Sequence, residues 1–155
     1  MNTVETSEGI GGMLRGIAEV TRDSKKVVFI GTAGFCTPFA ELGAYALRKN
    51  SAEIGFIVND NIEGAKAIIP TEYGMQLGES IDCHADAVVL LGGLSMPKIG
   101  IEIDIIKETL DNIFEGSERK LLIGICFQSM FESRGWTERL EFDYLFDADM
   151  TVAFK

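Results

Sequence analysis

The sequence predicts an α/β fold in which helices cover both faces of a mainly parallel sheet. Apolar segments of strand length alternate with amphipathic helical segments, and these strands lack the polar alternation of half-exposed strands. Glycine-rich turns join strands to helices. With 155 residues, 46% of them hydrophobic, the chain has the size and apolar content of one domain, so we expect residues 1–155 to form a single α/β domain.

The first part of the chain predicts two helices and two strands in alternation. Apolar residues at helical spacing between Ile10 and Ala18 predict a first helix, and the apolar run Val27–Ile30 predicts the first strand. In GTAGFCTPFAELGAYALRKN a glycine-rich loop leads into a helix, with Thr37 as N-cap and Pro38 at the first helical position. The segment Glu53–Val58 has the composition of a second buried strand.

The alternation continues through the second part of the chain. Asn61–Ile69 predicts a short helix that must end by Pro70, and Asp86–Leu91 predicts the third strand. Apolar residues at helical spacing from Ile103 to Phe114 predict another helix. Lys120–Cys126 then completes the pattern as the fourth strand.

These elements predict a three-layer, flavodoxin-like or Rossmann-like sheet with right-handed crossovers and the strand order 2-1-3-4-5. The tail Phe142–Phe154 is rich in β-forming residues and adds one or two edge strands, such as a C-terminal hairpin. The segment Pro70–Ala85 is longer than a usual connection and is either a lid or an edge hairpin. In such sheets, ligands bind outside the carboxyl ends of the strands, where the loops after strands one and three diverge.

The two most glycine-marked loops, GTAGFCTP and GGLSMP, follow these two strands. We therefore expect Gly34 and Gly93 to lie at a common rim, where free N–H groups at a helix start would stabilise an anion. A structural turn without a ligand is the alternative. Tyr73 or Gln76 would close over the ligand. The predicted ligand-binding residues are Gly31, Thr32, Gly34, Cys36, Thr37, Tyr73, Gln76, Gly92, Gly93 and Ser95.

A cysteine-dependent enzyme is a competing interpretation. Cys36 precedes a predicted helix, whose dipole favours a thiolate, and Glu41 in that helix is a candidate acid or base. Cys126 lies at a strand-to-helix turn that resembles the nucleophile elbow of class I glutamine amidotransferases. The single histidine, His84, is predicted at the opposite edge of the sheet. Buried structural cysteines are the alternative, and the sequence leaves open whether the chain is an enzyme.

Composition narrows the partners. A net charge of -10 and scattered Lys and Arg residues argue against nucleic acid. Apolar runs such as Leu121–Phe127 are far shorter than the roughly 20 residues that cross a bilayer, and the N-terminus lacks signal-peptide features. Three cysteines without CxxC spacing predict neither a disulfide framework nor a zinc site. We expect a cytoplasmic protein with a small-molecule ligand and no metal; a homodimer is compatible, and the sequence leaves open which cofactor, if any, it uses.

The strings KKVVFIGTAGFCTPFAELGAYALR, IIPTEYGMQLGE, DAVVLLGGLSMPK and GICFQSMFESRGW resemble an uncharacterised protein family of methanogenic archaea, DUF2124, over nearly the whole chain. The resemblance implies an archaeal cytosolic α/β protein and supplies no activity. The predicted topology also resembles flavodoxins, but GGLSMP has no aromatic residue on which a flavin would stack. Three functions stay open: binding of an anionic metabolite, nucleotide or cofactor, cysteine-dependent catalysis, and an interaction module of a methanogen complex.

Overall fold

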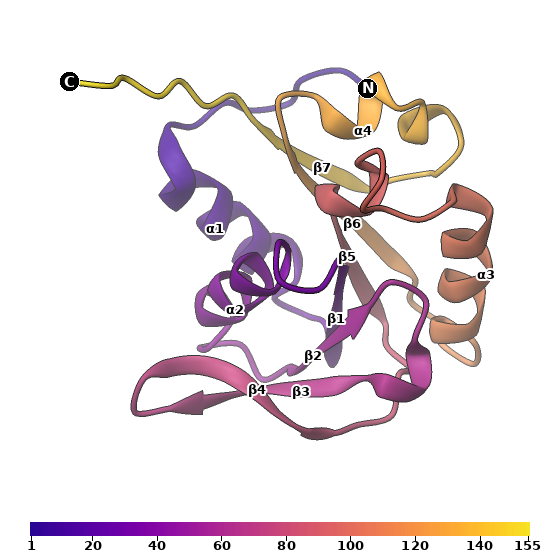
Figure 1. The fold of residues 1–155 in the computed structure, drawn as a ribbon. Coiled ribbons are helices and arrows are strands. Elements are labelled where there is room, and N and C mark those ends of the chain that lie inside the picture. Colours follow the sequence, from indigo (N-terminus) through magenta and orange to yellow (C-terminus); the bar gives the residue numbers. More distant parts are fainter.

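The structure is a computed structural model that describes all residues from Met1 to Lys155, and it contains one seven-stranded sheet with helices on both faces (Figure 1). The helices are α1 (Gly9–Val20), α2 (Thr37–Ala46), α3 (Ile103–Ile113) and α4 (Met130–Ser133), with single 3₁₀ turns η1 (Ile62–Gly64), η2 (Gly92–Ser95) and η3 (Trp136–Glu138). The strands are β1 (Lys26–Gly31), β2 (Glu53–Val58), β3 (Lys66–Thr71), β4 (Gly74–Ser80), β5 (Ala87–Leu91), β6 (Leu121–Phe127) and β7 (Tyr144–Ala148).

The strands are arranged in the order β4-β3-β2-β1-β5-β6-β7. All neighbours from β2 to β7 are parallel, whereas β3 runs antiparallel to β2 and β4 antiparallel to β3. The predicted α/β class with a mainly parallel sheet is therefore confirmed. The predicted order 2-1-3-4-5 is wrong for the sheet as a whole, because two antiparallel strands extend it beyond β2. Of the one or two edge strands predicted for the tail, the structure has one, β7, which is parallel to β6 and does not form a hairpin.

An edge hairpin, β3–β4, takes the place of the helix predicted over Asn61–Ile69. Only η1 is helical there, and β3 begins at Lys66. The β-branched pair before Pro70 favours an extended chain, and Pro70 is accepted in β3 opposite Met75. Of the two interpretations of Pro70–Ala85, the structure shows the edge hairpin, with the turn made by Gly74 at a φ of +110°. This turn points toward the amino-terminal end of β2, because β3 runs opposite to β2.

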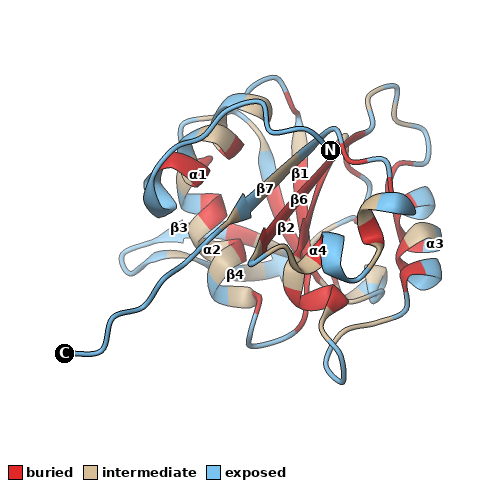
Figure 2. Cartoon of the chain, turned by 90° about the horizontal axis from the view of Figure 1, so that it is seen from above, coloured by how far each residue is buried: buried red, intermediate tan, exposed pale blue.

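Two apolar clusters, one on each face of the sheet, hold the layers together. Val27 and Phe29 of β1 pack with α1 and α2, whereas Val28 and Ile30 pack with α3 and the α4–η3 segment. Successive residues of β1 therefore face different layers, which explains why the strand is apolar without alternation. Figure 2 shows the buried β1 and β6 at the centre, and the exposed β3–β4 hairpin and terminal segments at the periphery.

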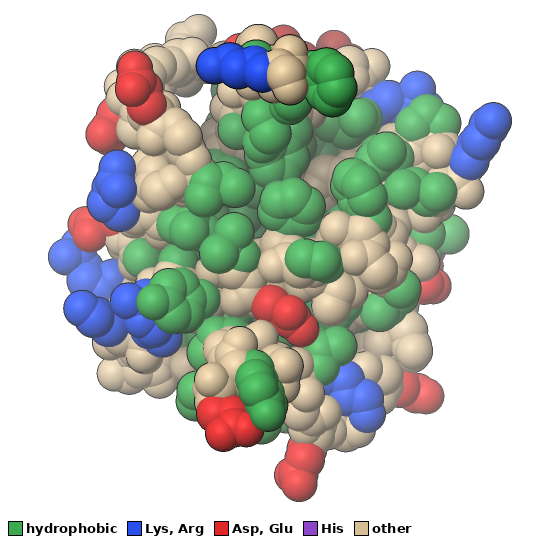
Figure 3. All heavy atoms as spheres, turned by 60° about the vertical axis from the view of Figure 1, so that its left-hand side comes forward, with side chains coloured by type: hydrophobic (Ala, Val, Ile, Leu, Met, Phe, Trp, Pro, Cys, Tyr) green, Lys and Arg blue, Asp and Glu red, His purple; other side chains and the backbone are tan.

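Some apolar side chains stay uncovered on one side of the molecule. They gather over α1, α2 and the hairpin, with few charged side chains in the middle of this face (Figure 3). Tyr45 of α2 and Leu77 of β4 are 48% and 42% exposed, and Glu41 is the only charged residue of α2. This side of α2 therefore has more apolar surface than a solvent-facing helix needs. None of the helices combines the length and the apolarity that crossing a bilayer requires.

Candidate functional site

The loops that follow β1 and β5 meet at one rim of the sheet, as the sequence predicts. A Cβ atom built on Gly93 would lie 2.5 Å from Cys36 Sγ and 3.0 Å from Thr32 Oγ1, so the backbone of Gly93 contacts the first βα loop directly. A Cβ atom built on Gly31 would likewise lie 2.3 Å from the Cβ atom of Cys36. The glycines at this rim let the two loops approach each other, which is a packing role.

The first βα loop uses its amides internally. The N–H of Phe35 donates to the Ala33 carbonyl (2.9 Å), the N–H of Cys36 donates to the Thr32 carbonyl (3.1 Å), and the N–H of Gly34 donates to Oγ1 of Thr37 (3.2 Å). Thr37 is the first residue of α2, and Cys36 rather than Thr37 occupies the N-cap position. Three donors of the predicted anion cradle are thus already bonded within the loop, which favours the structural turn at this position.

Neither cysteine of the competing enzyme interpretation has the surroundings of a nucleophile. Cys36 is 2% exposed, and its Sγ lies 3.3 Å from Thr32 Oγ1, within hydrogen-bond distance. Cys126 is 1% exposed, and burial raises the pKa of its thiol to about 11, so it is protonated at neutral pH. His84 precedes β5, at the amino ends of the strands, and its Nδ1 atom contacts Asp82 Oδ1 (2.7 Å). No histidine is therefore beside either thiol.

The structure separates the remaining predicted residues. Tyr73 lies at the tip of the β3–β4 hairpin and Gln76 on β4, toward the amino ends of the strands, so the prediction of a lid over the β1 and β5 loops is not supported. Glu41 is half-buried in α2. Gly92 packs against Cys126, and Ser95 is buried at the end of η2, where its Oγ donates to the Gly92 carbonyl (2.9 Å).

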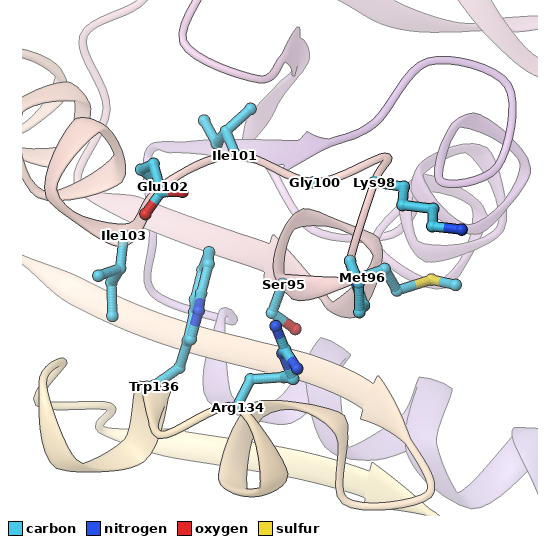
Figure 4. A pocket seen from close by; sticks show the side chains of 10 residues that line it. Ser95, Met96, Lys98, Gly100, Ile101, Glu102, Ile103, Arg134 and Trp136 are labelled. Carbon is cyan, nitrogen blue, oxygen red and sulfur yellow. The ribbon is translucent and has the colours of Figure 1, made fainter.

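A pocket of about 240 Å³ opens on the other side of Ser95, beyond the carboxyl ends of β5 and β6. One wall is the connection from η2 to α3, with Lys98 and Glu102, and the other is the α4–η3 segment, with Arg134 and Trp136. In Figure 4 the Arg134 side chain rises toward the Ser95 hydroxyl, and Lys98 extends away from Trp136. The Arg134 side chain thus lies at a space bordered by one aromatic ring, and Lys98 belongs to the wall with its ammonium group directed outward.

The wall from η2 to α3 has a tightly determined backbone. The N–H of Gly100 donates to the Met96 carbonyl, and the N–H of Ile101 donates to the Leu94 carbonyl, both at 2.9 Å. A Cβ atom on Gly100 would lie 2.1 Å from the Leu94 oxygen, so only glycine fits there. Lys98 has a φ of +73°, a left-handed conformation that is uncommon for a residue with a side chain.

The opposite wall is supported by aromatic packing. The Trp136 ring stacks on buried Phe131 at a centroid distance of 5.3 Å, and Trp136 itself is 5% exposed. Arg134, between them in sequence, is exposed and forms no ion pair, and the same holds for Lys98. The pocket therefore has two unpaired cations in a chain whose net charge is -10.

Sequence reasoning found one residue of this pocket, Ser95, and missed Lys98, Arg134 and Trp136. Lys98 directly follows GGLSMP, so the glycine-marked loop indicated the right region, but the predicted site ended before Lys98. Arg134 and Trp136 lie within GICFQSMFESRGW, which the sequence shows only as a strand followed by a turn. No group of three or more His, Cys, Asp or Glu side chains is arranged to hold a metal ion.

Comparison with known proteins identifies relatives along the whole chain. Residues 8–151 match the family described as uncharacterized proteins conserved in archaea, DUF2124. An uncharacterized protein of Methanocaldococcus jannaschii is 38% identical over 99% of this chain and 93% of its own length. An uncharacterized protein of Methanothermobacter thermautotrophicus is 40% identical over 97% of this chain and 95% of its own length.

A solved structure gives the same fold. The crystal structure of a protein of unknown function from Methanothermobacter thermautotrophicus superposes with a TM-score of 0.92 at 38% identity. The match covers 100% of this chain and 97% of that chain. The α/β arrangement described above is therefore that of an experimentally determined relative.

Proposed function

We propose that this protein, which belongs to the archaeal family DUF2124, binds a small anionic metabolite in the pocket between the η2–α3 connection and the α4–η3 segment. The proposal keeps the ligand class that the sequence favours and moves the site from the first βα loop to the ends of β5 and β6. It agrees with the rule for doubly wound parallel sheets, in which ligands bind outside the carboxyl ends of the strands.

The observation that supports the proposal most is the pair of unpaired cations, Lys98 and Arg134, around the pocket. A guanidinium presents a planar fork of N–H donors that matches a carboxylate or a phosphate, and an ammonium adds a second charge. Both side chains are free to turn toward a ligand because no carboxylate holds them. The helix α3 begins at Ile103, which also lines the pocket, so the positive end of its dipole lies at the same place.

The dimensions and the third charged group restrict the ligand. A volume of about 240 Å³ is below the roughly 300–1,000 Å³ of pockets that bury a drug-sized molecule. A phosphate monoester or a small carboxylic acid fits this space, and a dinucleotide does not. Glu102 repels a ligand that places negative charge on both walls, so the anion belongs on the side of Ser95 and Arg134.

Thermal unfolding in the presence of inorganic phosphate, phosphate monoesters, small carboxylic acids and nucleotides tests the proposal. A ligand at one hundred times its Kd stabilises the folded state by about 2.7 kcal/mol. Arg134→Gln should weaken binding of that ligand by roughly 10- to 100-fold, because it removes charged hydrogen bonds. Lys49→Gln is the matched control, since it removes one exposed positive charge at the end of α2 and should leave Kd unchanged.

Two results would refute the proposal. One is a panel in which no compound shifts the unfolding temperature. The other is a ligand whose affinity falls equally in Arg134→Gln and Lys49→Gln, because the net charge of the chain rather than the pocket would then determine binding.

A further inference from the structure

The last seven residues form an extended arm, residues 149–155, that leaves the body of the molecule after β7 (Figures 1 and 2). Its apolar side chains alternate with smaller or polar ones, and they are exposed: Met150 to 49%, Val152 to 83% and Phe154 to 101%. Alternation with a period of two is typical of a strand with one buried face. Nothing within the same chain covers that face.

We propose that two copies of this chain associate through their arms, which pair as antiparallel strands around a two-fold axis at Thr151. An isologous contact of this kind uses the same segment of both chains, so it needs no second surface. The partner is thus a second copy, and the contact lies apart from the ligand pocket, so this inference does not depend on the proposed function.

The register follows from the side-chain pattern. In antiparallel pairing, directly opposed residues lie on the same face of the sheet. Met150, Val152 and Phe154 of both chains therefore share a face when even-numbered residues of one chain lie opposite even-numbered residues of the other. With the axis at Thr151, Met150 of one chain faces Val152 of the other, and Phe154 faces Ala148. A register shifted by one residue would place these side chains on opposite faces.

The charges agree with the same register. With the axis at Thr151, Lys155 of one chain lies opposite Asp147 of the other, and Asp149 lies opposite Ala153. Lys155 and Asp149 are the only charged side chains of the arm, so these two side chains balance although the whole chain has a net charge of -10. Repulsion between two such acidic chains is therefore smaller for a contact through the arms than for a contact through more acidic parts of the surface.

The root of the arm is already fixed, which reduces the entropy lost on pairing. The N–H of Gln128 donates to the Ala148 carbonyl (3.1 Å), and the N–H of Met150 donates to the side-chain oxygen of Gln128. The strand before the arm, β7, is hydrogen-bonded to β6 on one side only and is an edge of the sheet. The arm leaves on the side of α1 (Figure 1), which is the side on which apolar side chains gather (Figure 3).

Disulfide cross-linking tests the register directly. The three native cysteines are buried, so Thr151→Cys adds the only exposed thiol. Opposed residues of antiparallel strands have Cα atoms about 4.5–5.5 Å apart, within the range that a disulfide spans. With oxidised glutathione, Thr151→Cys should form a covalent dimer rapidly, whereas Tyr73→Cys, 81% exposed at the hairpin tip, should not.

Sedimentation of the unmodified chain gives the second measurement. We expect a dimer whose Kd rises roughly 100-fold in Phe154→Ser, because each dimer loses two buried aromatic side chains, while Arg134→Gln leaves it unchanged. Even a weak dimer with a Kd of about 1 μM would be populated at a protein concentration of about 100 μM. A protein that is still monomeric at that concentration would overturn the proposal. Equal cross-linking rates for Thr151→Cys and Tyr73→Cys would overturn the register, and with it the pairing of the arms.

Discussion

Replacing Gly100 by alanine tests whether the wall from η2 to α3 is as constrained as its backbone contacts imply. The added Cβ atom would lie 2.1 Å from the Leu94 oxygen and 2.7 Å from both the Leu94 carbonyl carbon and the Met96 oxygen. All three are backbone atoms, so no side-chain rotation relieves the overlap. The chain must move, and the hydrogen bonds from Gly100 to Met96 and from Ile101 to Leu94 are lost or lengthened.

The expected cost follows from these contacts. Two hydrogen bonds contribute about 0.5–1.5 kcal/mol each, and forcing an atom into a packed site costs about 1–3 kcal/mol, so Gly100→Ala should lose about 3 kcal/mol in the free energy of unfolding. For a chain of this length, that loss lowers Tm by roughly 6–12 °C. Urea unfolding followed by circular dichroism measures the free energy, with thermal unfolding as a second readout.

Gly11→Ala is the matched control for Gly100→Ala. Gly11 is exposed in α1, and its added Cβ atom would meet only the end of the flexible Arg15 side chain. This substitution should stabilise the protein by up to about 1 kcal/mol, because alanine favours the helix over glycine. If Gly100→Ala loses less than 1 kcal/mol, the loop is not held by these contacts, and the fixed position assigned to Lys98 loses its basis.

Two further predictions concern the cysteines. Burial raises the pKa of the Cys126 thiol to about 11 in the folded protein, so as pH rises the unfolded chain releases this proton at a lower pH than the folded protein does. The free energy of unfolding should therefore fall by about 2–3 kcal/mol between about pH 9 and pH 11. The Cys126→Ala variant should lack this part of the fall in urea titrations, and an identical pH profile in both proteins would contradict the assignment. Iodoacetamide should label no native cysteine at the rate of a free thiol at pH 7, since all three are buried, and one fast-reacting site would restore the enzyme interpretation.

The parallel strands were predictable because their burial on two faces imposes an apolar composition that few other elements share. The hairpin was not predictable, because Ile62, Ala65 and Ile68 have the spacing of a helix. The segment Ile68-Ile69-Pro70-Thr71 favours a strand instead, but it forms one only when it can pair with the free edge of β2. That pairing is a long-range event with no local signature. Because β3 runs antiparallel to β2, Tyr73 lies near the amino ends of the parallel strands. Gly34 lies at their carboxyl ends, so Tyr73 cannot cover it.

The sequence predicts that the site lies at the carboxyl ends of the strands, but it does not predict most of the residues that line the pocket. Gly34 and Gly93 indicated the rim for two different reasons: Gly34 has a left-handed φ of +77° in the first βα loop, and Gly93 lets that loop approach its backbone closely. Arg134 and Trp136 reach the pocket through the packing of Trp136 on Phe131, which depends on how α4 follows β6. A sequence pattern reports the strand and the turn but not the direction in which the next helix returns.

The backbone conformation at the strand ends connects the pocket with the arm. Only four residues other than glycine have a left-handed backbone, and all of them follow parallel strands: Asn59, Lys98, Gln128 and Ser129. Glycine would adopt this conformation at lower cost, so each side chain must contribute something that glycine lacks. For Gln128 that contribution is visible, since its side-chain oxygen accepts the N–H of Met150 at the root of the arm. Lys98 is a cationic residue in the wall of the pocket. Two of the four positions thus lie beside the proposed sites, Lys98 in the pocket wall and Gln128 at the root of the arm, whereas Asn59 follows β2 and lies at neither.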